Sequence, residues 1–306
     1  MPTRLIMNGD DFGISRGVTD GILLAHRFGF LTSTSLMANM PAAEYALSRL
    51  PEAPGLGVGV HLNVCTGRPL LPACEIPSLV GADGQFLPPR ALIRKLWLFQ
   101  VSPSELEAEF RAQIQWVKER GISPAHVDSH HHLHLYPAAV GPFVRAAAAH
   151  GIRCSRAPRI TVWPKPRRAG AAHAGPWTRR IAADSYRRFL RAVPLRSLQT
   201  ADSRIGFSPQ GRHAAFSTKD QWRLTIAHLP EGTFEWVSHP GLPEEGFSNI
   251  DAIRAQRESD LHCLTSHDLL ELIAQRSIRL ITYRQLLAEP VSAPIRAAEG
   301  ALVAKD

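Results

Sequence analysis

The chain has 306 residues, and its 44% hydrophobic content is ordinary for a globular protein with a large core. No window approaches the roughly 18 apolar residues of a membrane-spanning helix. Residues 1–7 run directly into polar Asn8 and Asp10, without the apolar stretch of a signal peptide. We therefore expect a cytoplasmic protein. The cysteines show no C-x-x-C spacing, which argues against a zinc finger: Cys65, Cys74, Cys154 and Cys263. Because nothing else suggests secretion, we expect reduced thiols and no Cys65–Cys74 disulfide.

The positive charge is concentrated in one part of the chain. The net charge is +8, and residues 153–204 hold many arginines against only Asp184 and Asp202. The stretch at about 160–204 is also interrupted by Pro164 and Pro166, so we treat it as a basic insertion. Such a segment could meet anionic lipid headgroups or nucleic acid, or it could be an Arg-rich solvated face.

Short apolar runs alternate with helical patterns along the chain. In chain order, we predict strand 5–7, helix 16–29, strands 31–38 and 56–62, helix 102–121, strand 125–129, helix 137–150, strand 152–154, helix 178–192, strand 234–238, helix 250–276 and strand 278–281. This alternation indicates βα units, a largely parallel sheet and an α/β fold. We expect one domain over residues 1–289 and a loose tail over 290–306.

The helix at 102–121 has the clearest end signals. Ser102 can cap it, Pro103 occupies the first helical position, and Gly121 closes it. Glu105 stands three residues after Ser102, so the spacing predicts a capping box.

Polar residues follow several predicted strands at the point where each strand ends. They are Asp10 and Asp11, His61, the 126–134 segment and His239. In a βα barrel the carboxyl ends of the strands carry the active site, because the loops there converge on one mouth. The sequence therefore predicts that these four positions form one site.

Asp10 and Asp11 are adjacent carboxylates, which repel each other unless a positive charge holds them. A divalent metal could do so, with one carboxylate as a ligand and the other free as a base. The alternative is a turn or a helix cap before Ser15.

Residues 126–134, HVDSHHHLH, form the most specific local signal. Strand alternation places His126, Asp128 and His130 on one face, and also His132 and His134 if the extended form persists. Imidazole is the commonest transition-metal ligand, and a carboxylate such as Asp128 commonly fixes its tautomer. The alternative is a His-rich surface loop.

His61 and His239 are less specific when each is taken alone. His61 could be a hydrogen-bonded core histidine, and His239, followed by Pro240, could be a turn residue. Together with the other clusters, His61 could be a metal ligand and His239 a catalytic acid. One Asp and two His leave positions on a metal open for water and substrate, as hydrolysis requires. Amide hydrolysis also needs an acid for the departing amine, and His239 could supply it.

Four motifs in this order resemble those of the YdjC-like (ChbG) carbohydrate deacetylases. The likeness covers about residues 3–288 and rests on 8–13 (NGDDFG), 59–63 (GVHLN), 126–134 (HVDSHHHLH) and 238–241 (SHPG). Gly9 stands where the family more often has Ala, and the basic stretch from 160 to 204 is longer than in short members. Within the family, the branch linked to hopanoid biosynthesis is a candidate closer match.

The resemblance implies a distorted (β/α) TIM-like barrel and removal of N-acetyl groups from an amino sugar. It implies a divalent metal, Mg²⁺ or Zn²⁺, held by Asp11, His61 and His130, with Asp10 as general base and His239 as acid. The substrate would be an oligosaccharide or an N-acetylglucosaminyl glycolipid such as a hopanoid. A glycolipid would suit peripheral contact of the basic face with the anionic inner membrane.

Two alternatives remain open on the sequence. One is another barrel metallohydrolase that cleaves a different amide or an ester. The other is a non-catalytic basic protein that binds membrane or nucleic acid. The sequence has no helix-turn-helix, aromatic stacking signature or zinc finger, so we expect no nucleic-acid partner.

Overall fold

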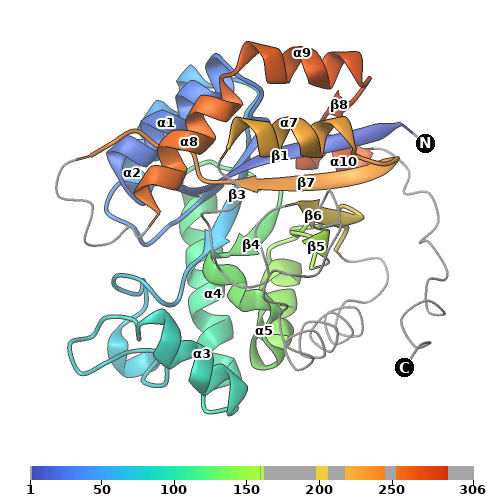
Figure 1. Ribbon diagram of the computed structural model, residues 1–306. Helices are drawn as coiled ribbons and strands as arrows, with labels where there is room; N and C mark the ends of the chain where they lie inside the picture. Colours follow the sequence, from blue (N-terminus) through green and yellow to red (C-terminus); the bar gives the residue numbers. More distant parts are fainter. Residues whose placement is uncertain (1, 159, 162–197, 206–217, 245–252, 289–306) are drawn as a thin grey trace, which may run out of the picture.

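The computed structural model describes residues 2–158, 160–161, 198–205, 218–244 and 253–288 (Figure 1). The predicted helix at 178–192, the predicted tail at 290–306 and most of the basic insertion lie outside these residues. Among the described residues, no helix combines the length and the apolar character that crossing a bilayer requires.

The described strands form one parallel sheet. Its order is β4-β3-β2-β1-β7-β6-β5, with β8 paired to the start of β1. The strands are β1 (Thr3–Phe12), β2 (Ser33–Leu36), β3 (Gly57–Leu62), β4 (Val127–Ser129), β5 (Ile160–Thr161), β6 (Ser203–Ile205), β7 (Gly232–Ser238) and β8 (Arg279–Leu280).

Two isolated parallel bridges carry the sheet beyond β4. Val127 pairs with Ser155, and Cys154 pairs with Gln199, four residues before β6. The two ends of the sheet therefore curve towards each other and are joined there by single bridges instead of regular strand pairing. The prediction of an α/β, distorted TIM-like barrel is confirmed.

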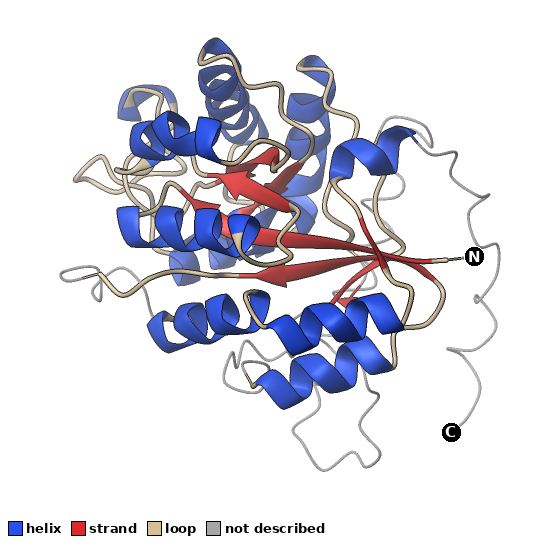
Figure 2. Cartoon of the chain, turned by 90° about the horizontal axis from the view of Figure 1, so that it is seen from above, coloured by secondary structure: helices blue, strands red, loops and turns tan. Residues whose placement is uncertain are grey.

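Helices surround the curved sheet (Figures 1 and 2). They are α1 (Arg16–Arg27), α2 (Ala43–Arg49), α3 (Pro89–Trp97), α4 (Pro103–Glu119), α5 (Pro137–Ala149), α7 (Lys219–Ala227), α8 (Arg254–Leu264), α9 (His267–Gln275) and α10 (Tyr283–Ala288). In Figure 1, α1, α7, α8 and α9 lie on one side of β1 and β7, and α3, α4 and α5 lie on the other.

Strand β1 is the centre of the sheet, and its side chains divide between two environments. Leu5 and Met7 belong to the large core shared with the helices, whereas Ile6 packs in a smaller cluster with Tyr283. Residues 8 and 10 have the same parity as Ile6, so the interior face of β1 turns from apolar to polar towards its carboxyl end. This change places polar groups where a barrel has its active site.

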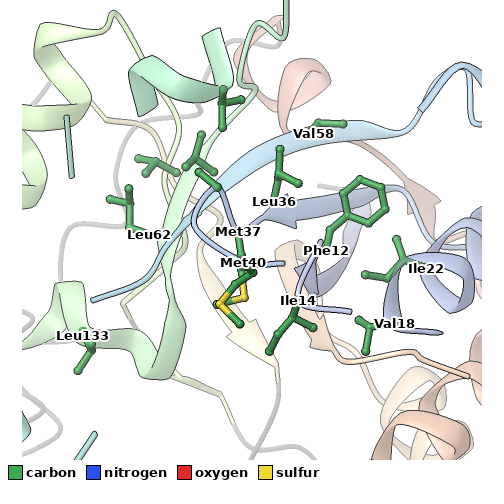
Figure 3. Close-up of a cluster of buried hydrophobic side chains, with 14 of the residues drawn as sticks. Phe12, Ile14, Val18, Ile22, Leu36, Met37, Met40, Val58, Leu62 and Leu133 are labelled. Carbon is green, nitrogen blue, oxygen red and sulfur yellow. The ribbon is translucent and has the colours of Figure 1, made fainter. Parts of the chain in front are cut away.

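The large core continues around the end of β1 (Figure 3). Phe12, Val18 and Ile22 pack with Leu36 and Val58, and all of them are buried. The packing of the end of β1 against α1 therefore fixes the loop that follows Asp10 and Asp11.

Two predicted helix features are wrong in detail. Ser102 caps α4 by accepting from Glu105 N, but the Glu105 carboxylate accepts from Ser78 N at 2.7 Å, so the box is only half formed. The Glu105 side chain anchors a distant loop instead. The predicted helix at 250–276 is divided into α8 and α9 at Thr265 and Ser266, because Ser266 starts a new helix as N-cap of α9.

Gly59 on β3 gives a test of how tightly the interior is packed. A Cβ at this position would lie 2.3 Å from the His126 ring, which is itself stacked on Tyr283. We expect Gly59→Ala to lower the free energy of unfolding by about 1–3 kcal/mol through overpacking. Chemical denaturation measures the change.

Gly141→Ala is the matched control. A Cβ there would meet only the flexible end of Arg145, at 3.1 Å, on helix α5. This variant should be neutral or more stable by up to about 1 kcal/mol, since Ala is the better helix former. Equal effects of the two substitutions would contradict the packing of His126 on β3.

Candidate metal centre and active site

A bulge at the end of β1 brings both carboxylates of the Asp pair to one place. The pairing with β2 slips between Gly9 and Phe12, and Asp11 has a left-handed backbone with φ of 68°. In a regular strand Asp10 and Asp11 would point to opposite faces. The bulge and the left-handed residue turn Asp11 back, so that each Asp has a carboxylate oxygen within 4.0 Å of His61 Nε2.

The Asp11 carboxylate faces two imidazoles with one oxygen and an arginine with the other. Oδ2 accepts from Arg257 Nη2 at 2.7 Å, on helix α8. Oδ1 lies 3.4 Å from His61 Nε2 and 3.1 Å from His130 Nδ1. Burial opposes ionisation, yet His130 and Arg257 outweigh it and hold the pKa of Asp11 well below its usual range. Asp11 is therefore a buried anion.

His61 is oriented by a second carboxylate. Its Nδ1 lies 2.7 Å from Asp128 Oδ1, which fixes Nδ1 as the donor and leaves Nε2 for Asp11. Burial disfavours the charged imidazole, but Asp128 and Asp10 more than offset this and raise the pKa of His61 to about 9. The environment of His61 thus favours positive charge at Nε2.

The histidine-rich segment does not continue as a strand. Strand β4 ends at Ser129, and His130–Leu135 forms a kinked 3₁₀ segment in which His131 and His132 have φ of 52° and 54°. The extended form stops at Ser129, so the condition for His132 and His134 to share a face with His130 is not met. Left-handed backbone in non-glycine residues is uncommon and concentrates at functional sites.

His126 and His134 have structural contacts. His126 packs on Gly59 and Tyr283, and its Nε2 lies 3.1 Å from Ser35 Oγ. His134 Nδ1 lies 2.6 Å from Ser129 Oγ, and both residues are buried. Of the histidines in this segment, His130 is the one that approaches Asp11 and His61 most directly.

Arg156 joins three buried carboxylates beneath the site. Its guanidinium contacts Asp10 with two nitrogens at 2.5 and 2.7 Å, Asp128 at 2.6 Å and Glu235 at 2.7 Å. The side chain is fully buried. Burial opposes its charge, but Asp10, Asp128 and Glu235 outweigh burial and raise the pKa of Arg156. This arginine holds Asp10 and the Asp128–His61 pair in one network.

His239 approaches the site from the end of β7. Its Nε2 lies 3.9 Å from Asp10 Oδ2, and its side chain is 13% exposed. Its backbone N–H donates to Asp260 Oδ2 at 2.8 Å, on α8. Burial raises the pKa of Asp260 to about 7. The structure thus brings together all five residues singled out in the sequence: Asp10, Asp11, His61, His130 and His239.

Sequence reasoning missed Arg156, Arg257 and Glu235. Arg156 follows the predicted strand 152–154, but in the sequence it belongs to the arginine-rich residues 153–204. Glu235 is a charged residue between buried Phe234 and Trp236, which is a usable signal of an interior partner. Arg257 lies on a helix almost 250 positions from Asp11 and has no local signal.

Asp11, His61 and His130 are suited to a divalent cation. Their candidate ligand atoms lie within 4.8 Å of one another, and Asp11 Oδ1 is buried without a hydrogen bond in the described part of the chain. Ligand atoms on one zinc, at bonds of about 2.0–2.2 Å, stand roughly 3–3.5 Å apart. Asp11 Oδ1 lies at such a distance from both His61 Nε2 and His130 Nδ1. Asp10 and Asp128 with His61 form a second such group, but Arg156 already neutralises both carboxylates.

Comparison with known proteins assigns the chain to a family. A family model described as YdjC-like protein matches residues 4–275. The chain belongs to the YdjC-like family. Two curated relatives, both named carbohydrate deacetylase, extend over nearly the whole chain. That of Geobacillus stearothermophilus is 34% identical over 93% of this chain and 98% of its own. That of Brevibacillus brevis is 30% identical over 92% and 99%.

A solved structural neighbour supports the fold. The crystal structure of an Enterococcus faecalis protein, provisionally described as a cellobiose-phosphate cleavage protein, has a TM-score of 0.73. It is 24% identical and covers 94% of this chain and 99% of its own. At that identity the likeness concerns the barrel alone.

The Arg156 network gives a prediction for this YdjC-like protein. Replacing Arg156 by Met leaves Asp10, Asp128 and Glu235 buried without their shared cation. Breaking a buried ion pair from one side costs about 3–5 kcal/mol. We expect Arg156→Met to lower the free energy of unfolding by about this amount, measured by urea denaturation.

Arg145→Met is the matched control, because Arg145 pairs with Glu107 while its side chain is 53% exposed. An exposed pair contributes about 0–1 kcal/mol, so this variant should stay near the stability of the unmodified protein. An Arg156 variant as stable as the control would show that the network does not stabilise the fold.

Proposed function

We propose that this protein is a metal-dependent hydrolase that removes N-acetyl groups from an amino sugar. The carbohydrate deacetylases among its relatives support the reaction class. The observation that carries the proposal is the buried Asp11 Oδ1, which faces two imidazole nitrogens beside the Asp10 carboxylate.

Asp11, His61 and His130 would hold the metal, Mg²⁺ or Zn²⁺. When bound, the cation would supply Lewis acidity towards the acetyl carbonyl and would lower the pKa of water. Asp128 would keep His61 Nε2 directed at the site, and Arg257 would hold the second oxygen of Asp11. The histidines would bind as neutral imidazoles, so binding displaces the proton that the carboxylates favour on His61.

Asp10 would act as the general base. Its Oδ2 lies 4.0 Å from His61 Nε2 and 3.9 Å from His239 Nε2, between the metal ligands and the expected acid. Arg156 and Asn8 hold the carboxylate in this position, with Asn8 Nδ2 donating to Oδ1 at 2.8 Å. From there Asp10 would accept a proton from the water that attacks the acetyl carbon.

His239 would act as the general acid. His239 is more exposed than Asp10, and its backbone N–H is held by Asp260. As the C–N bond breaks, His239 would deliver a proton to the amine nitrogen of the sugar. One water is consumed, and acetate and the free amino sugar are released.

For the substrate, we propose an N-acetylated oligosaccharide or an N-acetylglucosaminyl glycolipid such as a hopanoid. The excess of arginine between residues 153 and 204 supports a glycolipid, since a cytoplasmic leaflet is anionic. In that case the protein would be cytoplasmic and would contact the inner membrane face peripherally.

A screen for acetate release tests the function. N-acetylglucosamine oligomers and N-acetylglucosaminyl lipids in neutral or anionic vesicles are each incubated with protein loaded with Mg²⁺ or Zn²⁺. We expect acetate and a free amine in equal amounts from at least one class. A product other than acetate would instead favour another metallohydrolase, and no metal uptake would favour a binding protein.

Two variants separate the assigned roles. Asp10→Asn should keep the metal and lose about 10²–10⁴ in turnover, as expected for removal of a general base. His130→Ala should lose metal stoichiometry, measured by elemental analysis after gel filtration. Full activity of Asp10→Asn on a competent substrate would contradict the assignment of the base.

A further inference from the structure

A cysteine and two histidines meet beside the expected metal centre. The ligand atoms of Cys65, His130 and His131 lie within 4.8 Å of one another. His130 also belongs to the group formed with Asp11 and His61, whereas Cys65 and His131 do not. The proposed deacetylation has no use for either of these two side chains.

The three residues come from two segments that the sheet places side by side. Cys65 lies in the loop after β3, and His130 and His131 begin the 3₁₀ segment after β4, the neighbour of β3. The rings of His130 and His131 are 4.3 Å apart. Cys65 is buried, His130 is half-buried and His131 is exposed, so a cation could enter from the His131 side.

The donor set differs in chemical softness from the neighbouring one. A thiolate and two imidazoles suit Zn²⁺ and softer cations, whereas Mg²⁺ prefers oxygen ligands. Burial raises the pKa of the Cys65 thiol to about 12, so without a metal the group remains a thiol. A coordinating cation deprotonates such a thiol outright, and the proton leaves to solvent.

We propose that Cys65, His130 and His131 form a second metal site, selective for soft divalent cations such as Zn²⁺ and Cd²⁺. Because His130 is shared, occupancy of this site withdraws it from Asp11 and His61. Soft cations in excess would therefore inhibit the enzyme through a site that Mg²⁺ does not enter.

The sharing of His130 follows from imidazole chemistry. A neutral ring has one nitrogen with a free lone pair, and the other nitrogen carries the proton. In the structure His130 Nδ1 faces Asp11 at 3.1 Å, so Nε2 is the nitrogen left for a partner elsewhere. A neutral His130 can use only one of them at a time, so the two sites compete.

Cadmium absorption tests the site directly, since a bound thiolate gives an ultraviolet charge-transfer band. All measurements use Cys74→Ser protein, because Cys74 is the exposed thiol. This background should show a saturable band equivalent to one thiolate. The band should vanish when Cys65→Ser is added, and His131→Ala should weaken Cd²⁺ binding at least tenfold.

Asp11→Asn serves as the control for the neighbouring centre. It removes a ligand of that centre and none of the proposed second site, so the cadmium band should remain. Absence of the band in the Cys74→Ser background, or its survival after Cys65→Ser, would overturn the proposal. Thermal melting of each variant identifies any that fail to fold.

The inhibition rests on the proposed function, and the cadmium band does not. With a competent substrate and saturating Mg²⁺, excess Cd²⁺ should inhibit Cys74→Ser protein at least tenfold more strongly than Cys74→Ser/Cys65→Ser protein. Equal inhibition of the two would overturn the competition for His130. Failure of acetate release with every substrate would count against the deacetylase alone and leave the absorption test decisive.

Discussion

The site depends on the different partners of the two oxygens of the Asp11 carboxylate. Arg257 occupies one oxygen, and the other is buried opposite the imidazoles of His61 and His130. A buried anion with an oxygen that lacks a hydrogen bond is costly unless a positive charge completes its surroundings. The bulge at the end of β1 and the left-handed backbone of Asp11 create this arrangement. The proposed metal, base and acid would all take their positions from it.

Around this carboxylate, the interior is held by balanced charges in place of apolar packing. Asp10, Asp128 and Glu235 share Arg156, and Asp128 in turn orients His61. Such a network is stabilising only when every member is satisfied, which couples the stability of the barrel to the geometry of the site. The same network holds the Asp10 carboxylate between His61 and His239.

Much of the site was predictable because it follows the ends of strands. Asp10, His61, His130 and His239 all follow apolar runs, and parallel strands bring those ends together. The turn of Asp11 was not predictable, since one bulged residue reverses the side-chain alternation. Nor was the 3₁₀ segment after Ser129, since the sequence did not determine the backbone of the histidine run beyond the predicted strand 125–129. Arg156 and Arg257 were missed because their partners are distant in sequence and their charge alone resembles surface charge.

The position of a bound hard cation tests the central claim most directly. Crystals of the protein grown with Mn²⁺ give anomalous difference density at the metal. We expect one peak bonded to Asp11 Oδ1, His61 Nε2 and His130 Nδ1, with Arg257 still on Asp11 Oδ2. A peak bonded instead to Asp10 and Asp128, with Asp11 uninvolved, would contradict it.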